Sequence, residues 1–112
     1  MKHIFTFLFF LITLIACQSP PACSTVSGTY SGTSVMGSSS GTCSIQINAD
    51  CSAVLNYDHG DFGSATENGT LEKTGDGFQF ISASGGGKYE VKVNGSELAL
   101  EGYNWHCEME KE

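Results

Sequence analysis

The chain has 112 residues, of which 40% are hydrophobic and 15% charged, and its formal net charge at pH 7 is −7. It contains no arginine, and after position 16 only Lys73, Lys88, Lys92 and Lys111 oppose twelve acidic residues. This balance argues against nucleic acid as a partner, because phosphate binding needs clustered Lys or Arg. The acidity either steers a basic protein partner or only keeps one small domain soluble.

The first sixteen residues are organised like a secretory signal. Met1–His3 is short and basic, and Ile4–Ile15 is apolar except for two threonines. This apolar run is too short to span a membrane, which takes about 20 residues. Leu14-Ile15-Ala16-Cys17 resembles the lipobox of bacterial lipoproteins. The resemblance implies cleavage before Cys17 and attachment of lipid to that cysteine.

We therefore expect residues 1–16 to be a lipoprotein signal peptide, 17–24 the lipidated cysteine and its tether, and 25–110 a β-barrel domain. The alternatives for the first segment are an ordinary signal peptide cut after Ala16 or a buried strand. Two or three acyl chains would anchor the protein stably to a membrane. The location implied is the bacterial cell envelope, and Gln18 after the cysteine favours the outer membrane by the sorting rule of enteric-type bacteria.

After the tether, the chain is predicted to be β-structure throughout. It contains 14 glycines and no stretch with apolar residues at helical spacing. Alternation of apolar and polar residues predicts seven or eight strands. They span residues 26–35, 42–48, 52–57, 65–73 with a break at Asn68-Gly69, 78–83, 89–93, 98–100 and, as an optional eighth, 103–109.

Turn residues separate these segments. Asp76-Gly77 and Asn94-Gly95 predict two-residue hairpin turns, while Gly37–Gly41 and Gly85–Gly87 predict flexible loops. Because every connection is short, neighbouring strands are expected to pair antiparallel. An open sheet of this kind leaves two edges exposed. We therefore predict a small all-β, antiparallel up-and-down meander barrel, with a β-sandwich as the alternative.

Four cysteines follow Cys17, and an even number in an exported chain predicts two disulfides. The meander puts Cys43 and Cys51 at opposite ends of one hairpin, beyond the Cα separation of about 7 Å that a disulfide allows. Cys23 enters beside Cys51, and Cys107 follows the seventh strand to the end where Cys43 lies. The predicted disulfides are therefore Cys23–Cys51 and Cys43–Cys107.

No group of residues predicts an enzyme, a metal site or a cofactor. Gly37–Gly41 matches the Gly-x-Ser-x-Gly pattern of a nucleophile elbow, but no helix follows it as that motif requires. Asp58, His59 and Asp61 could hold a metal with the distant His106, yet Asp and Gly residues also form turns and the spacing matches no known site. We expect a hairpin loop there and no metal.

Aromatic residues offer a second kind of site. They either line the mouth of the barrel and stack on a ligand or fill the core. These residues are Trp105, Tyr30, Tyr57, Tyr89 and Tyr103.

Ser82-Ala83-Ser84-Gly85 is followed by an aromatic strand, a glycine turn, an acidic and apolar strand and Cys107. This order resembles the membrane-bound inhibitors of c-type lysozyme, which are small envelope lipoproteins with a β-barrel. In that family a loop serine and a nearby lysine enter the lysozyme cleft. The resemblance implies that Ser84 and Lys92 contact a partner, although the tyrosine and lysine are shifted from the family's spacing.

The sequence therefore predicts a lipid-anchored envelope lipoprotein that acts as a non-enzymatic binding or structural module. Two alternatives remain open at this point. One is inhibition of a c-type lysozyme, a basic protein partner. The other is binding of a small apolar ligand inside the barrel. The membrane is a partner through the N-terminal lipid.

Overall fold

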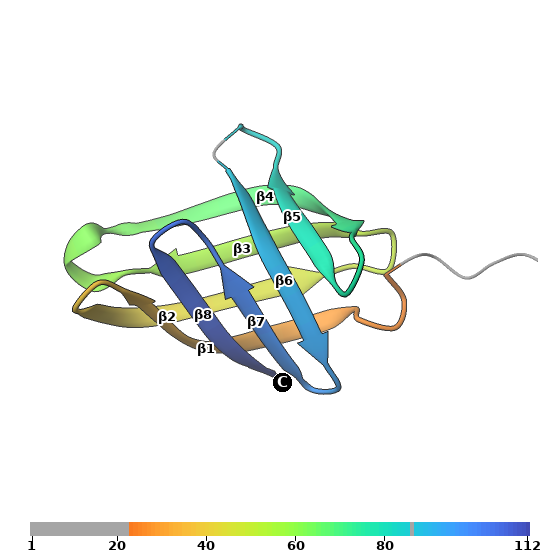
Figure 1. The fold of residues 1–112 in the computed structure, drawn as a ribbon, viewed down its shortest axis with the longest axis horizontal. Coiled ribbons are helices and arrows are strands. Elements are labelled where there is room, and N and C mark those ends of the chain that lie inside the picture. Colours follow the sequence, from red (N-terminus) through yellow and green to blue (C-terminus); the bar gives the residue numbers. More distant parts are fainter. Residues whose placement is uncertain (1–22, 86) are drawn as a thin grey trace, which may run out of the picture.

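A computed structural model describes residues 23–85 and 87–112 of the protein. Its eight strands form a closed antiparallel barrel in chain order from β1 to β8 (Figure 1). The predicted up-and-down barrel is thus confirmed, and closure rules out the β-sandwich. The predicted signal peptide, Cys17 and the residues up to 22 lie outside the described residues.

Every predicted strand is present, including the optional eighth. One short 3-10 helix, η1 (Gly60–Phe62), lies between β3 and β4, and no helix of the described residues is long and apolar enough to cross a membrane. The strands are β1 (Gly28–Met36), β2 (Ser39–Ile47), β3 (Ser52–Asp58), β4 (Ser64–Lys73), β5 (Phe78–Ser82), β6 (Lys88–Asn94), β7 (Glu97–Glu101) and β8 (Trp105–Lys111).

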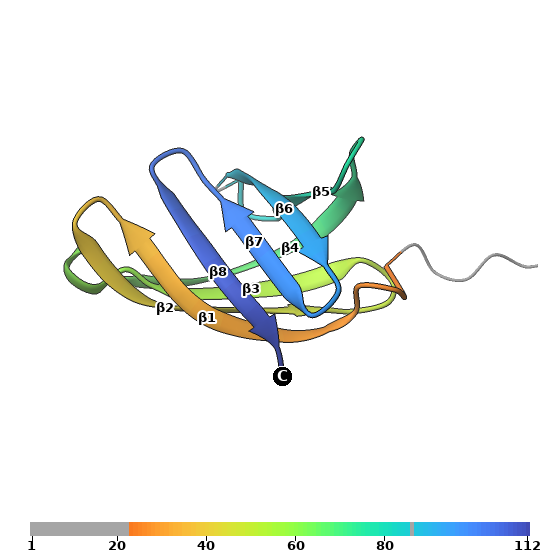
Figure 2. The same ribbon diagram turned by 60° about the horizontal axis from the view of Figure 1, so that its bottom comes forward.

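The barrel closes where β1 pairs with β8, and Figure 2 shows these two strands side by side. Gly32 on β1 lies opposite Cys43 of β2 on one side and Met109 of β8 on the other. A Cβ atom at Gly32 would overlap the backbone carbonyl of Glu108. The absence of a side chain at this position therefore allows the backbones of β1 and β8 to approach each other.

Successive side chains of a pleated strand point to opposite faces, so every second side chain points into the barrel, and most of these are apolar. These inward side chains, together with two residues that precede β1, form one continuous core. Its members are Cys23, Val26, Tyr30, Cys43, Ile45, Ile47, Ala53, Leu55, Leu71, Phe80, Tyr89, Val91, Leu98, Leu100, Trp105, Cys107 and Met109.

Several predicted connections were wrong in detail. Gly37–Gly41 is not a flexible loop: Gly37 and Ser38 form a two-residue turn, with φ +61° at Gly37, and β2 begins at Ser39. Strand β4 continues through Asn68-Gly69 without a break. The turn after β6 consists of Gly95-Ser96, because Asn94 already pairs with Glu97.

The turn at Asp76-Gly77 is also longer than predicted. Lys73 pairs with Phe78, which leaves a four-residue connection, and the amide of Thr74 donates to the carbonyl of Gly77 across 2.9 Å. Pairing of β4 with β5, and not the local Asp-Gly signal, thus sets the length of this turn.

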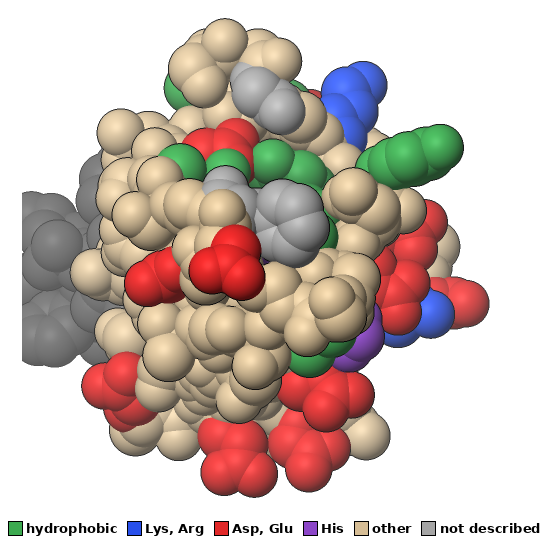
Figure 3. All heavy atoms as spheres, turned by 90° about the vertical axis from the view of Figure 1, so that its left-hand side faces the viewer, with side chains coloured by type: hydrophobic (Ala, Val, Ile, Leu, Met, Phe, Trp, Pro, Cys, Tyr) green, Lys and Arg blue, Asp and Glu red, His purple; other side chains and the backbone are tan. Residues whose placement is uncertain are grey.

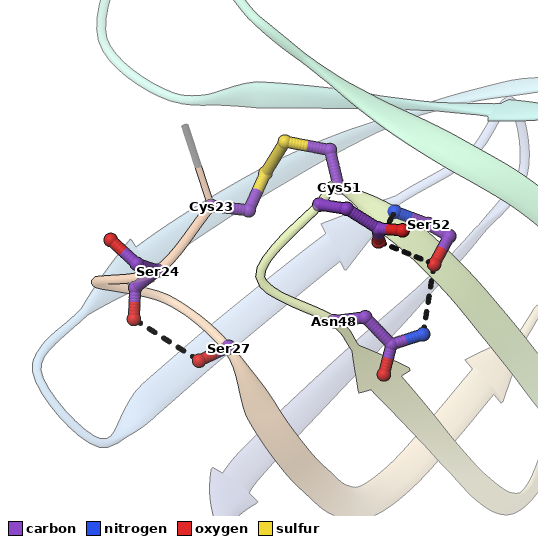
Figure 4. The surroundings of a disulfide bond; sticks show 7 residues. Cys23, Ser24, Ser27, Asn48, Cys51 and Ser52 are labelled. Atoms are coloured by element: carbon purple, nitrogen blue, oxygen red, sulfur yellow. Dashed lines mark hydrogen bonds between the residues drawn. A yellow bond between two sulfur atoms is a disulfide. The ribbon is translucent and has the colours of Figure 1, made fainter. Parts of the chain in front are cut away.

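The predicted Cys23–Cys51 disulfide is present and joins the chain before β1 to the β2–β3 turn, with a Cα separation of 5.1 Å (Figure 4). Ser52 reinforces this turn, since its hydroxyl and its amide both donate to Asp50 and hold the pKa of that carboxyl below its usual value. Asn48 donates to the same hydroxyl across 2.8 Å.

The second predicted disulfide is absent from the structure. Cys43 and Cys107 do lie together, but as buried free thiols. They project from β2 and β8, the two neighbours of β1, so they meet across β1 and not on adjacent strands. The hydrogen bond between them lowers the pKa of Cys43 and raises that of Cys107.

The connections divide between the two ends of the barrel. The Cys23 end carries the disulfide, the turns after β2, β4 and β6, and the C-terminal residue, whose amide donates to Thr29. The His59 end carries the turns after β1, β3, β5 and β7. In Figure 1 the β2–β3 turn lies on the right and the β1–β2 and β3–β4 turns on the left.

The contact at Gly32 yields a stability prediction. We expect Gly32→Ala to lower the free energy of unfolding by about 3 kcal/mol, because the new methyl group must displace backbone and not a flexible side chain. Gly75→Ala is the matched control, since nothing lies within 4 Å of a Cβ there. Urea denaturation of both variants measures the difference, and equal stabilities would contradict a close β1–β8 approach.

Candidate functional site

Four polar side chains are buried among the described residues: Ser34, His59, Glu67 and Ser82. Ser34 is 0% exposed, His59 3% and Glu67 8%. Buried polar groups normally have hydrogen-bond partners. Two atoms of this set have none, His59 Nε2 and Glu67 Oε1, which makes their surroundings the candidate site.

Glu67 points into the barrel because it lies four residues before the buried Leu71 on β4 and therefore shares its face. One oxygen, Oε2, accepts hydrogen bonds from the hydroxyls of Tyr57 and Tyr89, at 2.8 and 2.7 Å. These donors come from β3 and β6, on either side of β4 and β5. The other oxygen is buried and bare.

His59 is the first residue after β3, and its backbone amide donates to Gly63 to close the loop. The Ser34 hydroxyl donates to the carbonyl of Asp58 at 2.9 Å, so its oxygen accepts from Nδ1–H of His59 at 3.3 Å. This tautomer leaves Nε2 as a bare lone-pair acceptor. Burial lowers the pKa of His59 despite the opposing charge of Asp58, so the ring is neutral at pH 7.

A cluster of aromatic rings lies beside His59 and Glu67, the two residues with unpaired atoms. The imidazole of His59 stacks on Tyr57, with ring centroids 4.6 Å apart, and lies 4.7 Å from Trp105. Trp105 also packs against Tyr57 at 5.3 Å and edge-on against Tyr89 at 5.0 Å. His59 therefore covers the face of the Tyr57 ring whose hydroxyl binds Glu67.

The two tyrosine hydroxyls stay protonated donors. Burial raises the pKa of Tyr57 and of Tyr89, and the hydrogen bonds and negative charge of Glu67 raise both pKa values further. Each phenol therefore stays neutral and donates its hydrogen bond to the carboxylate.

No described lysine neutralises Glu67. Lys73 covers the ring of Phe78, with Nζ 4.9 Å from the centroid, and Lys111 lies against Gly28 at the Cys23 end. Lys88 and Lys92 are exposed on the outer face of β6. The carboxyl group therefore lies in the interior without a basic partner among the described residues.

The structure brings together some predicted site residues and separates others. Trp105 packs against both Tyr57 and Tyr89, and these residues belong to the hydrophobic core or pack against it, which is the second of the two alternatives expected. Tyr30 instead fills the core and donates to Val26, and Tyr103 is fully exposed.

The Asp58, His59 and Asp61 segment forms the predicted hairpin loop. Asp58 and Asp61 are exposed, whereas His59 turns inward, and His106 is exposed on β8. No group of three metal-ligating side chains occurs in the described part of the chain.

Ser84 and Lys92, the residues implied by the lysozyme-inhibitor resemblance, lie apart. Ser84 is exposed in the connection after β5 at the His59 end, and its hydroxyl is 3.0 Å from that of Ser82. Lys92 lies towards the other end of β6, opposite Ala99 of β7. It borders an outer groove of about 590 Å³ together with Glu97, Glu108 and Glu110.

Sequence reasoning missed Glu67 and Ser34. A signal for Glu67 was available, because steps of two back from the apolar Leu71 reach position 67 and predict an inward carboxylate. Ser34 gave no such signal, since its role depends on His59, 25 residues further along the chain.

Comparison with known proteins shows the fold only. No protein-family model matches the chain, and no curated protein matches it. Its structure is similar to that of a lipoprotein YedD from Klebsiella pneumoniae, with a TM-score of 0.61 and 12% sequence identity. The similarity covers 85% of this chain and 78% of the other.

The hydroxyl donors to Glu67 can be tested by single-atom changes. We expect Tyr89→Phe to lower the free energy of unfolding by about 1.5–3 kcal/mol, because a hydrogen bond to a buried charged group is lost. Tyr103→Phe is the control, as that side chain is fully exposed. In a Glu67→Gln background the Tyr89 effect should shrink. If Tyr89→Phe and Tyr103→Phe have the same free energy of unfolding in urea, the hydrogen bond from Tyr89 to Glu67 does not stabilise the fold.

Proposed function

We propose that the protein is a lipid-anchored lipoprotein of a bacterial envelope, and that its barrel is a non-enzymatic binding module. Its ligand would bind at the His59 end. The observation that carries this proposal is the pair of bare, buried acceptors, His59 Nε2 and Glu67 Oε1, behind one aromatic cluster. A native barrel gains nothing in stability from such unpaired atoms, and a bound ligand would supply their partners.

The position of the predicted anchor supports this arrangement. Cys17 precedes Cys23 by six residues, which can span at most about 20 Å. Cys23 is fixed to the β2–β3 turn, at the end of the barrel opposite His59. An anchor at Cys17 would therefore hold the Cys23 end near the membrane and leave the His59 end facing away from it.

The structural comparison also supports the envelope location. The protein of similar fold is described as a lipoprotein, and this chain carries its own lipobox-like sequence. The two observations are independent, because one concerns the barrel and the other the residues that precede it. The outer membrane remains the proposed destination, because Gln18 follows the predicted lipidated cysteine.

Mass spectrometry of the protein expressed as a full chain in a bacterium tests the anchor. We expect the mature chain to begin at Cys17 with a diacylglycerol on its sulfur and to fractionate with membranes. Cys17→Ser should abolish lipid attachment, since serine lacks the thiol, whereas Cys43→Ser should leave attachment intact. A mature chain without lipid on Cys17 would refute the anchor.

A basic protein such as a c-type lysozyme is the second candidate partner. The outer wall of β6–β8 opposes like charges directly, in the cross-strand pairs Glu90–Glu101 and Glu97–Glu110. Like charges at such positions destabilise a sheet. A cationic protein docked on this wall would relieve the repulsion, and the acidic net charge would steer it there.

A lysozyme lysis assay at low and high salt examines this candidate. Binding through the acidic wall predicts inhibition that weakens with salt and with the double change Glu97→Gln and Glu110→Gln. Ser84→Ala distinguishes binding through the acidic wall from insertion of a loop serine into the lysozyme cleft. Ser84 lies at the His59 end, so its loss should weaken inhibition only if the loop serine is used. Lack of inhibition by the unmodified protein would eliminate lysozyme as a partner.

A further inference from the structure

We propose that the His59 end binds the ammonium group of a primary amine, with Glu67 as its counter-ion and His59 Nε2 as a second acceptor. This inference rests on the proposed function and names the ligand class of the same site. It follows from the kind of polar atom left unpaired, from the surrounding rings and from the charge of this end of the barrel.

With Glu67 ionised, both unpaired atoms accept hydrogen bonds and neither can donate one. Glu67 Oε1 belongs to a carboxylate whose other oxygen already takes two hydroxyl donors. His59 Nε2 is a lone pair, since the ring proton is on Nδ1, directed at Ser34. The missing partner must therefore donate hydrogen bonds, which excludes carboxylate and phosphate ligands.

The carboxylate further favours a cation over a neutral donor. A buried charge is costly unless it is paired, and no described lysine pairs with Glu67. A primary ammonium group has three N–H donors and one positive charge, so it satisfies both requirements at once. A water molecule satisfies only the first.

The aromatic rings keep water away from the buried carboxyl group. The ring of Trp105 lies 5.3 Å from that of Tyr57 and 5.0 Å from that of Tyr89, and the hydroxyls of the two tyrosines donate to Glu67. An ion pair is strongest where water is excluded. Tyr89 and Trp105 are each only 9% exposed, so the site meets that condition.

The surface of this end suits the approach of a cation. Figure 3 looks onto the His59 end and shows more acidic than basic side chains. Asp58 and Asp61 both lie exposed in the β3–β4 loop that carries His59. Such a field raises the local concentration of cations and disfavours anions.

Trp105 provides the readout, since it is the only tryptophan of the chain and belongs to the cluster. The experiment titrates the mature protein, in nanodiscs of zwitterionic lipid, with four probes that share one butyl chain: butylammonium, butyltrimethylammonium, butanol and butyrate. We expect a saturable change in fluorescence with butylammonium, and binding of the other three at least about tenfold weaker, a difference of about 1.4 kcal/mol.

Glu67→Gln should weaken butylammonium binding at least about tenfold, because the counter-ion is lost while the shape is kept. Glu72→Gln is the matched control, since Glu72 is exposed on the same strand. If Glu67→Gln does not fold, as judged by circular dichroism, the four probes on the unmodified protein decide alone.

Three results would overturn the inference. Tighter or equal binding of butyltrimethylammonium would show that the bare acceptors do not contact the ligand. Equal binding of butanol or butyrate would show an apolar site, and the binding function would then stand without the ammonium assignment. No response to any probe would mean that water alone occupies the site, while the lipid anchor would still be decided separately by mass spectrometry.

Discussion

The pairing of β1 with β8 is the constraint on which the rest of this structure depends. It removes both sheet edges and gives every strand one face that is turned towards the interior. The pairing needs two backbones in contact at Gly32, where a methyl group has no room. Once the barrel is closed, a residue is buried when its side chain points inward from its strand. Glu67 points inward from β4, and its carboxylate therefore lies in the core.

Glu67 shows what such a closed interior demands of a charged group. Two phenol hydroxyls from different strands satisfy one oxygen, and burial keeps both phenols protonated. The same low-dielectric surroundings make the second, unpaired oxygen expensive. An apolar residue at this position would remove that cost, so Glu67 is not explained by its contribution to stability alone.

Much of the fold follows from the sequence, whereas the site follows only in part. Period-two alternation identifies the strands, and short connections imply the meander and the Cys23–Cys51 disulfide. Alternation on β4 also reveals the inward direction of Glu67. The contacts of Tyr89 with Glu67, and of Ser34 with His59, depend on how distant strands are staggered around the barrel. Local patterns do not encode that stagger, so they bring Cys43 and Cys107 to the same end of the barrel without showing that β1 lies between their strands.

The Cys23–Cys51 disulfide also determines how mechanical force enters the barrel. Without it, a pull on the chain before Cys23 would act on the first residues of β1 and unzip that strand from its neighbours one hydrogen bond at a time. The disulfide transfers the pull to the β2–β3 turn, which Asn48, Asp50 and Ser52 brace. A pull on the chain before Cys23 would then act on the β2–β3 hairpin, and β1, which closes the barrel, would be protected from peeling.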